Sequence, residues 1–415
     1  MDMTRRAEAE VQGRASSGNG TRLRDVPANG LVRPAYGTAS LADVLPAALA
    51  ALGLPGAADP LGLTEQLAGV RRVAVLLVDG LGFHQLPLAA PHAPALADAL
   101  AGRLGRLRAL TAPFPSTTPT SLVSLGTGAA PGEHGILGFT LNVPGTDRVL
   151  THINWWEDPD PLRWQPLETR FAAAAAAGFD VTVVSSPDFA DSGLTRAANR
   201  GAAYRGARGG DELAEEMLRA LAGAAPPALV YGYLPDLDRV GHLCGVDSQP
   251  WREQAAVVDR LVTQVVTGLP ADAALLVTAD HGQLDVPDDH RFDLDADPRL
   301  RAGIRVVAGE PRVRYLHTLP GAADDVVAAW RGVLGDAAWV AHRAEAVAAG
   351  WFGPVPERHL ERVGDVVVAC HDRYAVLATR TEPVMVGQLV AYHGSYTATE
   401  MVIPLLVVRS VAPGG

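Results

Sequence analysis

Mostly apolar runs of strand length alternate along the chain with stretches that have helical spacing. The apolar runs lie at 72–78, 179–184, 228–233 and 274–278. Such runs are typical of strands that are buried on both faces, as in a parallel sheet. A predicted helix between the last two runs carries apolar side chains on one face, at Trp251, Ala255, Val258, Val262 and Val265. Alternation of strands and helices predicts an α/β protein built from βα units.

The pattern changes between residues 291 and 389. Short predicted strands at 312–317 and 365–369 alternate there with predicted helices at 324–334 and 343–349. A last apolar strand at 401–408 must then rejoin the main sheet. We therefore expect a doubly wound, mostly parallel α/β sheet formed by residues 37–290 and 390–415, with a smaller α+β cap subdomain inserted at 291–389.

The first 36 residues are polar and rich in Gly and Ser, which predicts a disordered N-terminal tail. This segment contains no apolar stretch that could act as the core of a signal peptide. No later run approaches the ~18 apolar residues that a transmembrane helix needs. These features predict a cytoplasmic protein without a membrane partner.

Composition narrows the range of partners. The chain has 415 residues, of which 48% are hydrophobic, so it can form a sizeable core. Its formal net charge of −11 argues against a nucleic-acid polymer as the partner, because such binding depends on neutralising phosphates. The two cysteines, Cys244 and Cys370, have no CxxC spacing and indicate no disulfide framework.

Residues 114–139 contain the first candidate for chemistry. Thr118 is predicted as the N-cap of a helix and Pro119 as its first residue, so the Thr118 hydroxyl would face the unpaired amides of a helix start. Anions bind well at such a position. Taken alone, however, a Thr-Pro pair before a helix is more simply explained as a cap.

Other polar residues follow the predicted strands in the same way. These are Asp79, the pair Asp238 and His242, the pair Asp280 and His281, and finally His393. In a parallel α/β sheet, the segments after the strands converge at one edge, where ligands bind. Three Asp, three His and one Thr at this edge would form a two-metal site.

The order and content of these motifs resemble those of the alkaline phosphatase superfamily, within it the type I phosphodiesterase/nucleotide pyrophosphatase family, over residues 70–410. The resemblance implies an alkaline phosphatase-like fold. It implies Thr118 as the nucleophile. It also implies two sets of metal ligands, Asp79, Thr118, Asp280 and His281 for one ion and Asp238, His242 and His393 for the other. Asp238 is preferred to Asp236 because it lies four residues before His242, the spacing that the family uses.

One position departs from the family. Many of its diesterases have an Asn at about the position of Phe139, where it helps to hold a phosphoryl oxygen. This sequence has Asn142 three residues later. Which group takes over that contact is left open.

Imidazole and carboxylate ligands without thiolate suit two Zn²⁺ ions, with Mn²⁺ as an alternative. One ion would activate the Thr118 hydroxyl for attack on phosphorus, and the other would stabilise the leaving oxygen. The expected activity is hydrolysis of a small-molecule phosphodiester or pyrophosphate through a phospho-threonine. No Arg lies within the nucleophile segment to bind a monoester dianion, and the nearest candidates are Arg108, Arg148 and Arg239.

Other functions remain open at this point. A phosphomonoesterase, or a phosphomutase or phosphotransferase, could use the same metals and nucleophile. A non-catalytic metal-binding module is disfavoured by the complete nucleophile segment. The Trp155-Trp156 pair could supply apolar surface to a substrate. The sequence does not indicate an oligomeric state.

Overall fold

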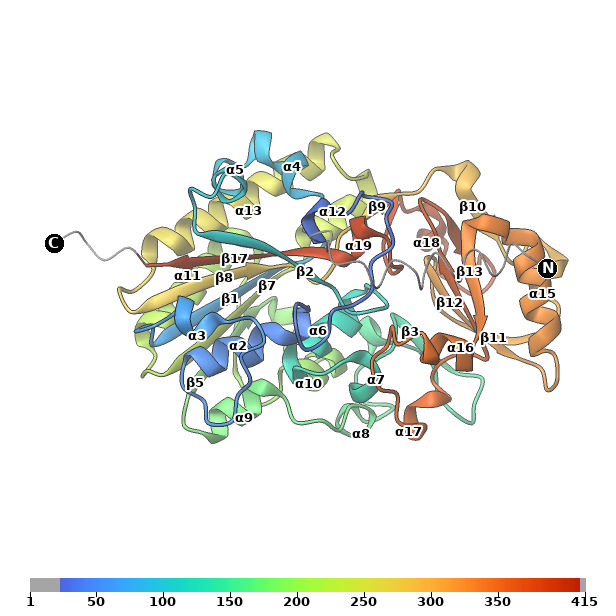
Figure 1. Ribbon diagram of the computed structural model, residues 1–415, viewed down its shortest axis with the longest axis horizontal. Coiled ribbons are helices and arrows are strands. Elements are labelled where there is room, and N and C mark those ends of the chain that lie inside the picture. Colours follow the sequence, from blue (N-terminus) through green and yellow to red (C-terminus); the bar gives the residue numbers. More distant parts are fainter. Residues whose placement is uncertain (1–22, 411–415) are drawn as a thin grey trace, which may run out of the picture.

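The computed structural model describes residues 23–410, and its centre is a seven-stranded sheet with the order β2-β17-β8-β1-β7-β5-β6 (Figure 1). The strands are β1 (Arg72–Val78), β2 (Arg106–Thr111), β5 (Asp180–Ser185), β6 (Ala203–Gly206), β7 (Ala228–Leu234), β8 (Ala273–Thr278) and β17 (Val402–Arg409). Strand β1 pairs in parallel with both β7 and β8, and β5 pairs in parallel with β6 and β7. Only β17 runs against its neighbours in this sheet.

Helices cover both faces of this sheet, as the doubly wound prediction requires (Figure 1). One face carries α5 (Pro94–Leu100), α11 (Gly209–Gly223) and α13 (Gln249–Gly268). The other carries α2 (Val44–Ala51), α6 (Thr118–Thr127), α9 (Arg170–Ala176) and α10 (Gly193–Asn199). Because both faces are covered, six of the seven residues of β1 are fully buried, which explains its continuous apolar run.

A second, smaller unit lies at the opposite end of the molecule from the C-terminus of β17 (Figure 1). It is a four-stranded antiparallel sheet of β11 (Ile304–Glu310), β12 (Val313–Thr318), β14 (Val366–Cys370) and β13 (Ala338–His342). Helix α15 (Ala323–Leu334) packs against it through Val326, Val327, Trp330 and Leu334. The predicted fold class, an α/β core with an inserted α+β subdomain, is confirmed.

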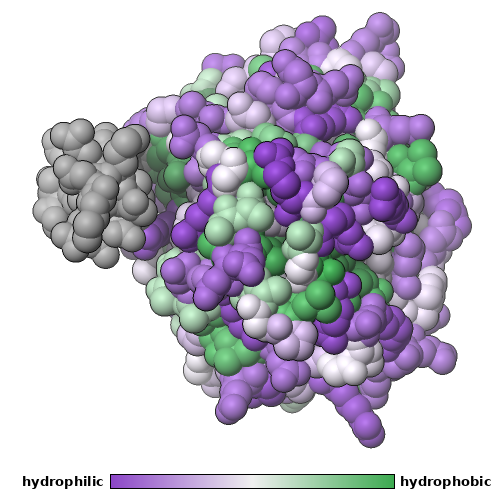
Figure 2. Space-filling model, turned by 90° about the vertical axis from the view of Figure 1, so that its right-hand side faces the viewer, coloured by the Kyte–Doolittle hydropathy of each residue, from purple (hydrophilic) through white to green (hydrophobic). Residues whose placement is uncertain are grey.

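The outer face of this unit is mostly hydrophilic, and its apolar residues form small separate groups (Figure 2). Helix α15 accounts for part of this surface, since Asp324, Asp325 and Arg331 are exposed on it. The subdomain therefore buries its apolar residues in a cluster of its own.

Two short ladders lie where the chain leaves the core and returns to it. Strand β9 (Leu284–Asp285) pairs with β16 (Ala391–Tyr392) on the core side of this junction, and β10 (Arg291–Asp293) pairs with β15 (Ala375–Leu377) within the insertion. The Arg312 guanidinium also donates to both carboxylate oxygens of Glu400, at 2.9 and 2.7 Å, and both side chains are fully buried. Loss of one partner from such a buried pair typically costs about 3–5 kcal/mol, so this contact firmly joins the two units.

The prediction of a disordered tail up to residue 36 is wrong for residues 23–36. Val32 is buried, and its amide donates to the Tyr396 carbonyl. The Tyr36 hydroxyl accepts from the Phe114 amide at 3.1 Å and donates to the Trp351 carbonyl at 2.9 Å. These contacts tie the segment to parts of the chain that are distant in sequence. The rest of the predicted tail, residues 1–22, lies outside the described residues, as do residues 411–415.

Some strands were not predicted. Strand β2 has a mostly half-exposed pattern with three arginines nearby, and β6 is a short edge strand in which no residue is buried. Neither has the continuous apolar run that marks the central strands. None of the helices among residues 23–410 combines the length and the apolar character that crossing a membrane requires.

We predict that Tyr36→Phe lowers the free energy of unfolding by about 1–3 kcal/mol, because the buried Phe114 amide loses its acceptor. Urea denaturation of both proteins measures this difference. The matched control is Tyr374→Phe, whose hydroxyl makes no hydrogen bond within the described part of the chain. Equal losses in the two variants would show that the N-terminal segment is not held by this contact.

Candidate metal centre and nucleophile

The order of the central strands brings three acidic residues to one edge of the sheet. Asp79 directly follows β1, Asp280 follows β8, and Asp238 lies in the first turn of α12 (Asp236–Cys244), just after β7. Since β1 lies between β8 and β7, the three ends are neighbours. Gly80 has a φ of 74°, and a Cβ there would lie 2.9 Å from the Asp238 Cβ. Glycine thus allows the Asp79 turn to approach Asp238 closely.

Asp79, Asp280 and His281 form one group of ligand atoms, all within 4.8 Å of one another. The His281 Nε2 lies 3.5 Å from an Asp79 oxygen and 3.3 Å from an Asp280 oxygen. The Thr118 hydroxyl completes this group, at 3.2 Å from His281 Nε2 and 3.5 Å from Asp79 Oδ2. The structure therefore brings together all four residues expected at the first ion.

Asp238, His242 and His393 form the second group, again within 4.8 Å. The Nε2 atoms of His242 and His393 lie 3.2 Å apart, and that of His242 lies 3.2 Å from Asp238 Oδ2. The rings of His281 and His393 stack with their centroids 3.6 Å apart, which places the two groups side by side. Asp236 points elsewhere and pairs with Arg239.

Each of the three imidazoles is oriented through its other nitrogen. The Nδ1 atoms of His242, His281 and His393 lie 2.7, 3.2 and 2.9 Å from the backbone carbonyls of Ala391, Gly282 and Ser116. A carbonyl accepts only from N–H, so Nδ1 carries the proton and Nε2 presents a lone pair to the centre. This arrangement is typical of histidines that bind a metal.

Hydrogen bonds also orient the carboxylates of Asp79 and Asp280, each through one oxygen. Asp280 accepts from the amides of Gly80 and His281 with Oδ1, and its Oδ2 is buried without a partner. Asp79 accepts from the Tyr233 hydroxyl with Oδ2 at 2.5 Å, and its Oδ1 is buried without a partner. Buried carboxylate oxygens are costly unless they are paired or coordinate a cation. The residues present therefore fit two divalent metal ions.

The pKa shifts agree with this crowding of acids. Burial, together with the Asp280 and Asp238 carboxylates, raises the pKa of Asp79 well above its usual value. Burial also raises the pKa of Asp280. Burial acts to raise the pKa of Asp238, but this pKa is lowered because His242, His393 and His281 together outweigh the effect of burial. Like charges this close are stable together only when a proton or a cation lies between them.

Thr118 is the first residue of α6 rather than its N-cap, which is Thr117. The predicted position was therefore wrong by one residue, although Pro119 still lies within the first turn. The consequence for the Thr118 hydroxyl is small, since it still lies at the helix start, where amides have no intrahelical partner. It faces the metal ligands on one side and a pocket on the other.

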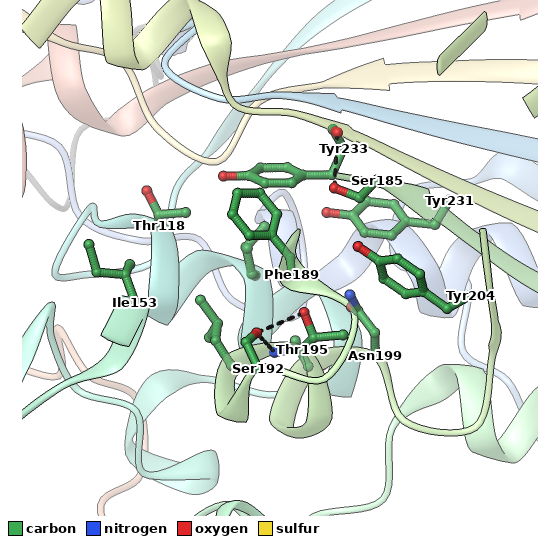
Figure 3. Close-up of a pocket in the computed structure, with 13 residues that line it drawn as sticks. Thr118, Ile153, Ser185, Phe189, Ser192, Thr195, Asn199, Tyr204, Tyr231 and Tyr233 are labelled. Carbon is green, nitrogen blue, oxygen red and sulfur yellow. Dashed lines mark hydrogen bonds between the residues drawn. The ribbon is translucent and has the colours of Figure 1, made fainter. Parts of the chain in front are cut away.

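The pocket encloses about 570 Å³ of empty space, part of it open to solvent. Figure 3 shows Thr118 at one end, the rings of Tyr233 and Phe189 beside it, and Tyr231, Tyr204 and Asn199 farther away.

Several other residues that the sequence offered as candidates lie outside the pocket. Trp155 is buried and Trp156 is 56% exposed, and neither lines the pocket. The pocket obtains its apolar surface from tyrosines and Phe189 instead. Arg108, Arg148 and Arg239 also lie outside the pocket lining. Asn142 is buried in strand β3 (Thr140–Asn142) and does not line the pocket.

Sequence reasoning missed two residues that donate to proposed metal ligands, Tyr233 and Gln283, and one buried acid near them, Glu310. The Tyr233 hydroxyl donates to Asp79, and the Gln283 amide donates to Asp238 Oδ1 at 2.8 Å. Glu310, at the end of β11, is buried close to Gly394, where an added Cβ would lie 2.7 Å from its Cδ. Burial raises the pKa of Glu310 to about 8, although the nearby Thr117 hydroxyl opposes the shift. In the sequence, the only feature that could have identified any of these three residues is the closeness of Gln283 to Asp280 and His281.

The fold has clear relatives among solved structures. The chain superposes on murine ectonucleotide pyrophosphatase/phosphodiesterase 5 with a TM-score of 0.63 and 20% identity, covering 82% of this chain and 88% of that one. An inactive variant of the same murine protein was solved in complex with AMP, and its match is similar, at 19% identity. Phosphonoacetate hydrolase from Sinorhizobium meliloti 1021, in complex with phosphonoformate, matches with a TM-score of 0.59 and 21% identity, covering 84% and 92%.

At these identities the solved structures show a shared fold. No curated protein matches the chain. The family model of type I phosphodiesterase/nucleotide pyrophosphatase matches residues 73–396, a span that contains every residue of both ligand groups. The chain belongs to the type I phosphodiesterase/nucleotide pyrophosphatase family of the alkaline phosphatase superfamily, and it is a metal-dependent hydrolase of that type.

Proposed function

We propose that the protein hydrolyses a small-molecule phosphodiester or pyrophosphate at a two-metal centre, with Thr118 as the nucleophile. The observation that carries the proposal is the position of the Thr118 hydroxyl, 3.2 Å from His281 Nε2 and at the mouth of the pocket. A nucleophile in this position can contact both a metal ion and the phosphorus of a bound ester.

We propose Asp79, Thr118, Asp280 and His281 as ligands of one ion, and Asp238, His242 and His393 as ligands of the other. The donor set of imidazole and carboxylate groups favours Zn²⁺, with Mn²⁺ as the alternative. Two bound ions would lower the pKa of the Thr118 hydroxyl and neutralise charge on the attacking and leaving oxygens.

The chain's own residues would then act in two steps. The Thr118 oxygen gives up its proton and forms a bond to phosphorus while the bond from phosphorus to the departing oxygen breaks, and the departing oxygen takes up a proton. The phosphoryl group, with its remaining substituent, then lies on Thr118. Water forms a bond to the same phosphorus while the bond to Thr118 breaks, one water proton restores the Thr118 hydroxyl, and the phosphate product is released. The start of α6 supports both steps, because its free amides and positive dipole end favour the negative charge on the phosphoryl oxygens.

The pocket supports a diester or a pyrophosphate over a monoester. A monoester dianion needs additional positive charge around its third free oxygen, and no Arg or His lines the pocket among the described residues. An ester with a second organic group finds aromatic surface directly beside Thr118, at Tyr233 and Phe189. Transfer of the phosphoryl group to an alcohol, as in a phosphomutase, would use the same residues but has no separate support. The cytoplasmic location expected from the sequence stays a prediction.

We expect that treatment with EDTA abolishes hydrolysis and that Zn²⁺ or Mn²⁺ restores it, because both ligand groups contain buried acids that need a cation. The rate of bis-p-nitrophenyl phosphate hydrolysis measures both effects. Full activity of the stripped protein would contradict the two-metal centre.

A variant of a residue that only supports a proposed ligand tests the same centre without removing a ligand. Gln283→Leu removes the donor to Asp238 and should weaken metal binding about 10- to 100-fold in a competition titration with a chelator. Gln264→Leu, on the exposed face of α13, is the matched control and should leave the affinity unchanged. Equal affinities in the two variants would mean that Asp238 does not bind metal.

Thr118→Ala should lower kcat by at least about a thousandfold, because the attacking oxygen is lost, while Thr118→Ser retains part of the rate. Metal content and melting temperature should stay close to those of the wild type. Thr120→Ala is the control, since the Thr120 hydroxyl has no hydrogen-bond partner within the described residues. If Thr120→Ala loses activity and Thr118→Ala does not, the nucleophile has been assigned to the wrong threonine.

Bis-p-nitrophenyl phosphate should have a higher kcat/KM than p-nitrophenyl phosphate, because the neutral pocket accepts a second organic group and does not compensate a second negative charge. Both substrates are measured on one metal-loaded preparation. A tenfold preference for the monoester, or about 1.4 kcal/mol of transition-state discrimination, would reverse the assignment.

A further inference from the structure

Glu310 is a buried acid that belongs to neither ligand group. It is only 5% exposed, and its Oε1 has no hydrogen-bond partner among the described residues. The hydroxyl of Thr117, the residue before the nucleophile, is also buried without a partner there. Burial raises the pKa of Glu310 and the Thr117 hydroxyl opposes this shift, so the two groups lie close together. Two such atoms beside Thr118 point to a water molecule or a reactant that they bind.

The main chain around Glu310 is fixed on both sides. Before it, the Gly309 carbonyl accepts from the Thr140 hydroxyl at 2.8 Å. After it, the buried guanidinium of Arg312 is paired with Glu400 of the core. Glu310 is the last residue of β11, so these two contacts hold the end of that strand of the inserted subdomain against the core. Its side chain therefore has a defined position.

This position lies next to the second ligand group. Gly394, which follows His393, has a φ of 127°, and a Cβ there would lie 2.7 Å from the Glu310 Cδ and 3.0 Å from its Oε2. Glycine thus allows Glu310 to pack on the backbone that carries His393. Burial lowers the pKa of His242, but Asp238 and, to a smaller extent, Glu310 raise it. The Glu310 carboxyl is therefore close to two members of the group.

The proposed reaction gives this location a meaning. Thr118 attacks phosphorus from one side, and in an in-line displacement the departing oxygen leaves from the opposite side. Water enters from that same side in the second step. Since Thr118 belongs to the first ligand group, the opposite side faces the second group, beside which Glu310 lies.

The other polar side chains of the second group already have partners. The Nδ1 atoms of His242 and His393 donate to backbone carbonyls, and their Nε2 atoms are proposed metal ligands. Asp238 accepts from Gln283 with Oδ1, and its Oδ2 lies 3.2 Å from His242 Nε2. Among the described residues of this part of the site, Glu310 therefore supplies the free acceptor.

We propose that Glu310 is a catalytic residue of the second step, in which its carboxyl accepts a hydrogen bond from the attacking water and directs the water oxygen at the phosphorus on Thr118. The water oxygen bonds to phosphorus while the bond to the Thr118 oxygen breaks. One water proton restores the Thr118 hydroxyl, and the other stays on the phosphate product. Glu310 takes up no proton, and both the ionised and the protonated carboxyl have an oxygen that accepts.

The proposal rests on the proposed function for Thr118 and for the two steps. Bis-p-nitrophenyl phosphate separates these steps, because the first releases p-nitrophenol and the second releases p-nitrophenyl phosphate. In Glu310→Ala loaded with Zn²⁺, the second step should be about 10- to 100-fold slower and the first step unchanged, since only the water loses its orientation. Rapid mixing should therefore show a burst of p-nitrophenol stoichiometric with the protein. Mass spectrometry of the acid-quenched protein should find the p-nitrophenyl phosphoryl group on Thr118, at a higher level than in the wild type.

Two further variants separate orientation of water from a structural role. Glu310→Gln keeps the size of the side chain and an accepting oxygen, so it should accumulate less modified Thr118 than Glu310→Ala. Glu361→Gln, which changes an exposed acid of the same subdomain, is the matched control and should behave as the wild type. Bound Zn²⁺ and the melting temperature should be the same in all these proteins, because Glu310 lies outside both ligand groups.

Three results would overturn the proposal. Glu310→Ala could slow both steps equally, it could accumulate no more modified Thr118 than the wild type, or it could lose Zn²⁺ in proportion to its loss of turnover. Failure of the proposed function has a different signature, because the wild-type protein itself would then release no p-nitrophenol from the diester.

Discussion

Mutual repulsion among three buried carboxylates is the constraint on which this structure depends. Asp79, Asp238 and Asp280 are each less than a tenth exposed, and they come from the ends of three adjacent strands. Their second oxygens are held by donors from Tyr233, Gln283 and backbone amides. Such an arrangement is stable when a cation supplies the missing charge, so the fold and the metal requirement cannot be separated.

The proposed metal centre also takes residues from both sides of the inserted subdomain. His393 lies after the insertion, so the second ligand group forms only when the chain returns to the core. Its ring is fixed by the Ser116 carbonyl and by stacking on His281. Residues from before and after the subdomain therefore meet within a single group of proposed metal ligands.

The central strands could be predicted because their signal is local: a continuous apolar run marks a strand that is buried on both faces. Asp79 follows such a run directly and Asp280 follows one after a single residue, but the complete set of proposed metal ligands came from the resemblance of these motifs to a known family. The pocket could not be predicted in this way. Tyr231 resembled any apolar strand residue, and Phe189 and Asn199 come from a loop and a helix end whose positions depend on tertiary packing. The ordering of residues 23–36 was missed for the same reason, since Tyr36 acts through Phe114 and Trp351, both distant in sequence.

The buried contact between Arg312 and Glu400 has a consequence for how this enzyme can change. Glu400 also accepts from the Ser395 amide and the Thr397 hydroxyl, so it fixes the loop that follows His393. Any substitution that displaces Arg312, just before β12, would loosen this loop too, and with it the imidazole of His393. If His393 binds metal as proposed, evolution could adjust how tightly the enzyme holds the ion through mutations in an outer sheet, while every ligand stays the same.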